Sequence, residues 1–83
     1  MSVDREGPVP VYQQVAAVLR ARIEAGKIPP GRPLPSEPHL MQEFGVARET
    51  ARKAVRVLRD EGLVQIVQGR GAFVTSTSSQ PGA

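Results

Sequence analysis

The segment A-R-E-T-A-R-K-A-V-R-V-L-R, from Ala47 to Arg59, has the pattern of an α-helix with two unlike faces. At about 100° per residue, its apolar side chains gather on one side. They are Ala47, Ala51, Ala54, Val55 and Leu58. The arginines fall within a sector of about 80° on another side. They are Arg48, Arg52, Arg56 and Arg59, with Lys53 beside them and Glu49 as the single acid of the segment. A helix of this kind is suited to reading the major groove of DNA.

The basic charge of the chain is concentrated in this segment. The 83 residues have a formal net charge of +3, whereas residues 47–59 hold five basic residues and one acid, a local balance of +4. The remainder is therefore slightly acidic. This asymmetry suggests a polyanionic partner, although a solvated helix face would show the same run of charges.

Two further helices are expected upstream. Apolar residues recur at helical spacing from Val11 to Ala25, and Gly26 follows as a residue suited to a left-handed helix end. Four prolines in residues 27–35 exclude a helix interior and predict an extended connector. Ser36 is placed to cap a second helix, which stops at Gly45.

The spacing between the second and third helices is short. Only two residues separate Gly45 from Arg48, and a glycine-containing turn between two helices is typical of a helix-turn-helix. After the basic helix, residues 63–68 and 72–75 are rich in apolar and β-branched side chains and flank Gly69-Arg70-Gly71, which predicts a β-hairpin. The predicted fold is mainly α with a small β-hairpin: a winged helix-turn-helix with three helices and a two-stranded wing.

The predicted domain organisation is simple. Residues 1–9 form a flexible N-terminal arm, residues 10–75 form the winged helix-turn-helix domain, and residues 76–83 are disordered. No apolar run approaches the ~20 residues of a membrane span, and the N-terminus lacks the pattern of a secretory signal. We therefore expect a cytoplasmic protein with no membrane partner.

Enzymatic function is disfavoured. The chain has no cysteine and a single histidine, His39, so no metal site and no cofactor are expected. It lacks paired carboxylates beside a histidine and lacks a phosphate-cradling loop, so we expect no catalytic residues. The alternative to DNA binding is a winged helix that binds another protein. Such a surface should carry apolar anchors, and Val57 is the only apolar residue near the exposed face of the basic helix.

Two runs of sequence carry a resemblance to a known family. The run I-P-P-G-R-P-L-P-S-E-P-H-L-M-Q-E-F-G-V-A-R-E-T-A-R-K-A-V-R-V-L-R-D-E-G-L-V (28–64), followed by G-R-G-A-F-V (69–74), resembles the N-terminal DNA-binding domain of GntR-family bacterial transcription regulators. The segment P-V-Y-Q-Q-V-A (10–16) looks like the opening of that domain. The resemblance implies a regulator, expected to be a repressor, that binds double-stranded operator DNA with its third helix in the major groove and its wing at the minor groove.

The resemblance also has implications for partners. Family members usually bind a palindromic site as dimers, so we expect a homodimer on DNA. They usually carry a C-terminal domain that dimerises and binds a small effector. This chain is therefore expected to be either an isolated DNA-binding domain or a natural short form, and an effector is expected only if a C-terminal domain is missing.

The resemblance assigns DNA contacts residue by residue. Arg48, Thr50 and Arg52 match contact positions of the recognition helix, and Gly69 and Gly71 match the wing tip. Ser36 and Glu37 match the P-S-E signature of the second helix. Together with the residues inferred from charge, the expected DNA-binding set is Ser36, Glu37, Arg48, Glu49, Thr50, Arg52, Lys53, Arg56, Gly69, Arg70 and Gly71.

Several of these roles stay open between two chemistries. Arg48 and Arg52 can pair with guanine O6 and N7 or contact phosphates. Glu49 can accept from cytosine N4, or pair with Arg52 or Lys53 along the helix. Lys53 and Arg56 are expected at phosphates, and Arg70 in the minor groove or at an adjacent phosphate. Thr50 can donate to a phosphate or contact a thymine methyl group.

Two residues depart from the family pattern. Ala47 stands where the family commonly has Ser or Thr, so the N-terminus of the third helix is expected to lack a side-chain cap. Pro38 stands where some members have an arginine that contacts DNA, so that contact is not carried over.

Overall fold

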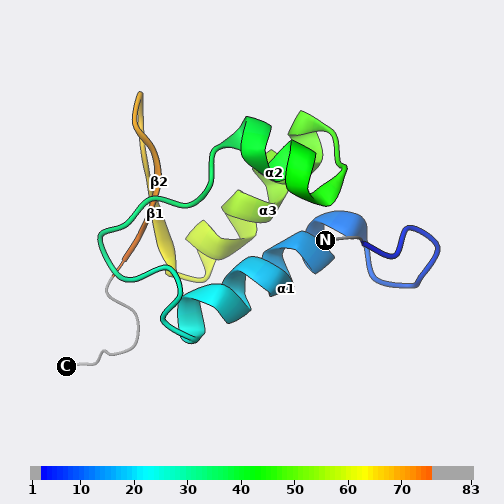
Figure 1. The fold of residues 1–83 in the computed structure, drawn as a ribbon, viewed down its shortest axis with the longest axis horizontal. Coiled ribbons are helices and arrows are strands. Elements are labelled where there is room, and N and C mark those ends of the chain that lie inside the picture. Colours follow the sequence, from blue (N-terminus) through cyan, green and yellow to red (C-terminus); the bar gives the residue numbers. More distant parts are fainter. Residues whose placement is uncertain (1–2, 76–83) are drawn as a thin grey trace.

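The computed structural model describes residues 3–75, which form three helices and a two-stranded antiparallel sheet (Figure 1). The helices are α1 (Val11–Glu24), α2 (Glu37–Phe44) and α3 (Arg48–Asp60), and the strands are β1 (Val64–Val67) and β2 (Gly71–Val74). Val64 lies opposite Val74, and Val67 lies opposite Gly71. The predicted fold class, mainly α with a β-hairpin wing, is confirmed.

The turn between α2 and α3 is built by local sequence signals. The Ser36 hydroxyl accepts a hydrogen bond from the His39 backbone N–H at 3.3 Å, which caps α2. Gly45 ends α2 with φ of 66°, a left-handed conformation that glycine adopts without strain. Ala47 occupies the N-cap position of α3 and makes no side-chain cap, as its residue type predicts.

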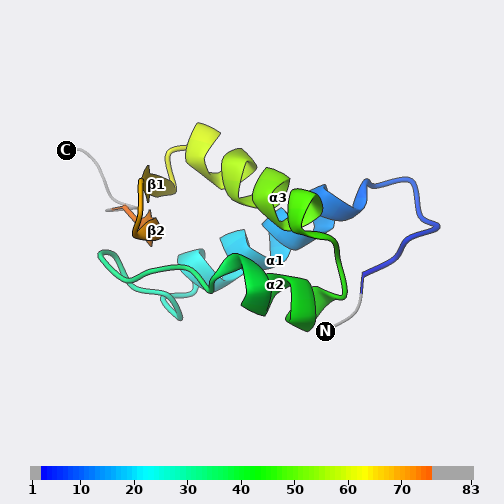
Figure 2. The same ribbon diagram turned by 90° about the horizontal axis from the view of Figure 1, so that it is seen from above.

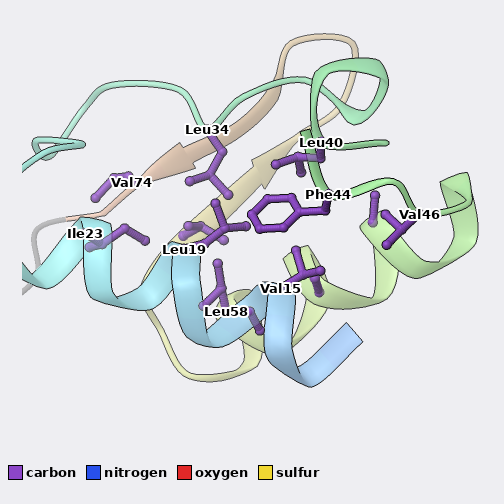
Figure 3. Close-up of a cluster of buried hydrophobic side chains, with 13 residues drawn as sticks. Val15, Leu19, Ile23, Leu34, Leu40, Phe44, Val46, Leu58 and Val74 are labelled. Atoms are coloured by element: carbon purple, nitrogen blue, oxygen red, sulfur yellow. The ribbon is translucent and has the colours of Figure 1, made fainter. Parts of the chain in front are cut away.

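One hydrophobic core holds all five elements together (Figure 3). Val15 and Leu19 of α1, Leu40 of α2 and Leu58 of α3 are fully buried. The same three helices also contribute Ala16, Ile23, Phe44, Ala51 and Ala54 to the core. The strands contribute Val64 and Val74, and the segments between the helices contribute Leu34 and Val46. The helix periodicity that predicted a buried stripe on each helix is thus realised in a single core.

The connector between α1 and α2 also supports the hairpin. The Leu34 N–H donates to the Ala72 carbonyl at 2.8 Å, and the Val74 N–H donates to the Arg32 carbonyl at 2.9 Å. The connector therefore runs along β2 as a partial third strand, with Leu34 anchoring it in the core. This pairing fixes the direction in which the hairpin leaves the helical part.

Residues 3–9 fold back onto the start of α1. The Asp4 N–H donates to Oε1 of Gln14 at 2.7 Å, and Nε2 of Gln14 donates to the Val9 carbonyl at 2.8 Å. The Arg5 guanidinium donates to the Gly45 carbonyl in the turn before α3. Flexibility of the arm stays a prediction, and the tail predicted at residues 76–83 lies outside the described residues.

The hairpin and the N-terminal residues lie at opposite ends of α3 (Figure 2). Among residues 3–75, no helix is both long enough and apolar enough to cross a membrane. As for α3, its surface that faces away from α1 and α2 is bordered by the hairpin at one end and by the turn after Gly45 at the other.

Candidate nucleic-acid interface

The third helix packs by one narrow side and leaves its basic side in solvent. Ala51, Ala54 and Leu58 have no exposed surface. Arg48, Glu49, Lys53, Arg56 and Arg59 are exposed, and Thr50 and Arg52 are half-buried at the margins. The two faces that the sequence predicted are therefore both present on α3.

A groove of about 710 Å³ lies between the start of α2, the basic side of α3 and the hairpin. We call it the α3–wing groove. Four arginines line it: Arg52, Arg56 and Arg59 from α3, and Arg70 from the hairpin tip. Ser36, Glu37 and Gly71 also line it, and its apolar residues include Leu34, Val55, Ile66 and Ala72. The groove thus combines basic and apolar side chains in one lining.

Arg52 is held by a carboxylate from another helix. Its Nε donates to Oε2 of Glu37 at 3.2 Å, and NH2 donates to Oε1 at 3.4 Å. This two-point contact fixes the guanidinium plane. The hydrogen bond with Glu37 raises the pKa of Arg52 above its ordinary value, with Glu49 adding a smaller effect. The sequence placed both residues in the site but did not predict that they pair.

Glu49 lies between two arginines on the exposed side of α3. Its carboxylate is 3.9 Å from NH1 of Arg52 and 3.8 Å from NH1 of Arg56. Of the two helix partners expected from the sequence, Arg52 is found, and Arg56 takes the place of Lys53. Acceptance from a cytosine amino group stays a prediction.

Lys53 lies on the opposite flank of α3, outside the α3–wing groove. Its Nζ is 5.5 Å from the centroid of the Tyr12 ring, at the start of α1. Arg59 donates from NH2 to Oδ1 of Asp60 at 3.0 Å, the next residue along the chain.

The hairpin tip presents Arg70 between two glycines in left-handed conformations. Gly69 has φ of 80° and Gly71 has φ of 108°, values that L side chains rarely adopt. Arg70 is exposed and lines the groove. The two glycines therefore allow the tight turn that carries a basic side chain at its apex.

The structure brings part of the predicted set together. Ser36, Glu37, Arg52, Arg56, Arg70 and Gly71 meet in the groove. Arg48, Glu49, Thr50 and Lys53 lie on α3 outside its lining, and Gly69 lies in the hairpin turn. Of the residues that the sequence assigned to the exposed side, Val57 instead packs against the core, which removes the one candidate apolar anchor there.

Ile66 is a groove residue that sequence reasoning missed. It is 44% exposed although it is a large apolar side chain. Strand alternation places Ile66 on the same face as buried Val64. Because the hairpin extends past the edge of the core, that face becomes groove lining two residues later. Strand alternation indicates the face of β1 on which Ile66 lies. No local sequence signal indicates where along that strand burial in the core ends.

Comparison with known proteins gives consistent relatives. The family model described as bacterial regulatory proteins, gntR family, matches residues 11–74. The chain is 39% identical over 75 residues to the transcriptional repressor NagR of Bacillus subtilis strain 168, covering 90% of this chain and 31% of NagR. It is 41% identical over 68 residues to MngR of Escherichia coli K12, a repressor of a mannosyl-D-glycerate transport and metabolism system, covering 82% of this chain and 28% of MngR. The chain thus spans about a third of the length of these relatives.

Among solved structures, AraR(DBD) in complex with operator ORX1 matches with a TM-score of 0.84. That protein is 41% identical to this chain, and the match covers 90% of this chain and 95% of AraR(DBD).

Proposed function

The chain belongs to the GntR family of bacterial regulatory proteins, and on that premise we propose that residues 10–75 are the sequence-specific, double-stranded DNA-binding domain of a transcriptional regulator. The observation that carries this proposal is the α3–wing groove. A helix with an exposed basic side lies next to a hairpin with an arginine at its tip, and arginines from both line the same groove. The operator complex of AraR(DBD), which has the same fold, supports it.

In the proposed complex, α3 enters the major groove, which is about 12 Å wide and admits one α-helix. Arg48 and Arg52 reach base edges, while Lys53 and Arg56 contact phosphates on the two sides of the helix. Thr50 lies near the start of α3, where it can reach a phosphate or a thymine methyl group. The hairpin places Arg70 at the adjacent minor groove, whose negative potential is strongest over A·T-rich steps.

The start of α2 has a different role in this proposal. Ser36 uses its hydroxyl to cap α2, and Glu37 holds Arg52. Both residues line the α3–wing groove and stay in the proposed DNA-binding set, and each also holds a part of the protein in place there. Glu37 cannot attract phosphates, because it is an anion.

The regulator is proposed to act as a repressor in the cytoplasm, where bacterial operators lie. NagR and MngR are both named as repressors. A palindromic operator would be occupied by two copies, because two half-sites on one duplex raise the effective concentration of the second copy. Effector binding would belong to a further domain, since the relatives are about three times as long as this chain. The relatives are transcriptional regulators, and no enzymatic role is proposed.

Selection from a random double-stranded DNA library, with bound sequences read at two salt concentrations, tests this function. A palindrome with A·T-biased positions under the hairpin is the expected result. The Arg48→Ala and Arg52→Ala variants test the two proposed base contacts. Each should lose enrichment at particular base pairs of the selected sequence. Unselective binding that disappears at the higher salt concentration would contradict sequence-specific recognition and leave only backbone attraction.

A further inference from the structure

Lys53 and Tyr12 form a contact that the α3–wing groove does not involve. The ammonium lies 5.5 Å from the ring centroid, within the range at which the electron-rich ring face attracts a cation. Tyr12 comes from the first turn of α1, whereas Lys53 comes from the middle of α3. The contact therefore joins two helices on the flank of α3 that is turned away from the hairpin.

The geometry of α3 explains why Lys53 is separate from the arginines. Each residue turns the helix by about 100°, so Lys53 points well away from Arg52, which lies in the groove. An α-helix in a major groove has a phosphate backbone on each side. The groove flank carries Arg52, Arg56, Arg59 and Arg70. On the α1 flank, Lys53 is the basic side chain that α3 provides.

The environment of Lys53 differs from that of the neighbouring arginines. Arg52 and Arg56 have Glu49 within 4 Å, and Arg59 has Asp60. Within residues 3–75, Lys53 is in no ion pair, and its ammonium lies over the Tyr12 ring. A neutral ring orients a cation without neutralising it. The full charge of Lys53 is thus kept for an external anion.

We propose that Tyr12 is a positioning residue that holds Lys53 ready to contact the DNA backbone on the α1 flank. The proposal rests on the proposed function. Half-buried Tyr12 is itself fixed by the fold, whereas an isolated lysine side chain samples many rotamers. The ring covers one side of the ammonium, which has three N–H donors, so donors remain for a phosphate oxygen. Part of the conformational entropy that Lys53 would lose on binding DNA is then already lost in the free protein.

The test is a double-mutant cycle on operator binding, measured over a range of salt concentrations. Lys53→Gln should weaken binding to operator and random duplexes alike and lower the salt slope by about one. Tyr12→Phe keeps the ring and should bind as the wild type does. Tyr12→Leu removes the ring and should weaken binding about two- to fivefold. In the Lys53→Gln background, Tyr12→Leu should have no further effect.

Each other outcome overturns the proposal. Equal losses from Tyr12→Leu with and without Lys53 would show a structural role for the ring. A loss in Tyr12→Phe equal to that in Tyr12→Leu would assign the contact to the hydroxyl group. Tighter binding by Tyr12→Leu would show that the ring withholds Lys53 from DNA.

Two controls complete the design. Lys27→Gln, in the connector beyond the other end of α1, should leave the salt slope unchanged, and thermal unfolding should show that every variant folds. Failure of the proposed function is separately visible, because a wild-type protein without sequence preference would still show the Tyr12–Lys53 coupling on random DNA.

Discussion

Glu37, the first residue of α2, accepts two hydrogen bonds from Arg52 of α3, at 3.2 and 3.4 Å. The two residues are 15 positions apart and meet in the α3–wing groove. A basic side chain proposed to read DNA is thus oriented by an acid that is not on its own helix. This arrangement limits the directions in which the guanidinium can point.

Arg52→Ala should weaken operator binding by about 1–3 kcal/mol and flatten specificity at one position. Glu37→Gln should reduce the difference between the free energies of operator binding and random-DNA binding by about 1 kcal/mol. The reason is that Arg52 loses its fixed orientation while an anion is removed from the surface. Fluorescence anisotropy on both duplexes measures these values. If Glu37→Gln has the same effect in the Arg52→Ala background, Glu37 does not act through Arg52.

Removal of Arg70 tests the hairpin. Arg70→Ala should reduce operator affinity and lower the salt slope by about one unit, because one phosphate neutralisation is lost. The slope is read from affinities at several salt concentrations. Arg32→Ala, on the connector beside β2, is the matched control and should keep the wild-type slope. A wild-type slope for Arg70→Ala would mean that the hairpin tip does not touch the backbone.

Glu49 opposes non-specific binding by its charge. Glu49→Gln should tighten binding to random duplexes by roughly 0.2–1 kcal/mol, the scale of exposed ion pairs, because Arg52 and Arg56 are freed from their shared carboxylate. If Glu49 accepts from cytosine N4, the variant should also lose discrimination at one base pair. Selection with the variant measures both effects, and an unchanged random-duplex affinity would refute the charge argument.

The missing cap of α3 predicts a stabilising substitution. Ala47 has an extended conformation, with φ of −72° and ψ of 161°, which suits a capping side chain. Ala47→Ser should raise the free energy of unfolding by about 0.5–2 kcal/mol, and Ser36→Ala should lower it by a similar amount through loss of the α2 cap. Denaturant unfolding measures both, and a lower stability for Ala47→Ser would show that the turn does not admit the hydroxyl group.

The Arg22–Glu43 ion pair predicts an acid sensitivity of folding. The hydrogen bond from Arg22 lowers the pKa of Glu43 below its ordinary value. A carboxylate with a lowered folded-state pKa contributes stability above its unfolded pKa of about 4.3, and this contribution is lost as pH falls through the folded value. The difference in unfolding free energy between wild type and Glu43→Gln should therefore be largest near pH 7 and shrink below about pH 4.3. A difference that does not change with pH would contradict this linkage.

The sequence by itself determined the elements and their order. Apolar spacing gave three helices, Ser36 and Gly45 gave the bounds of α2, and Gly69 with Gly71 gave the hairpin turn. These features follow from local periodicity and from backbone conformations that few residue types adopt. They can therefore be predicted from the sequence. The charge pattern of α3 likewise identified its exposed side before any neighbour was known.

The tertiary structure decided which partners these side chains have. The sequence listed Glu37 and Arg52 separately, and only the packing of α2 on α3 makes them a pair. In the same way, α1 brings Tyr12 to Lys53, and the length of the hairpin beyond the core exposes Ile66. Such contacts depend on how distant segments are placed by the shared core. A local sequence pattern does not predict that placement, because each side chain has several equally suitable partners elsewhere in the sequence.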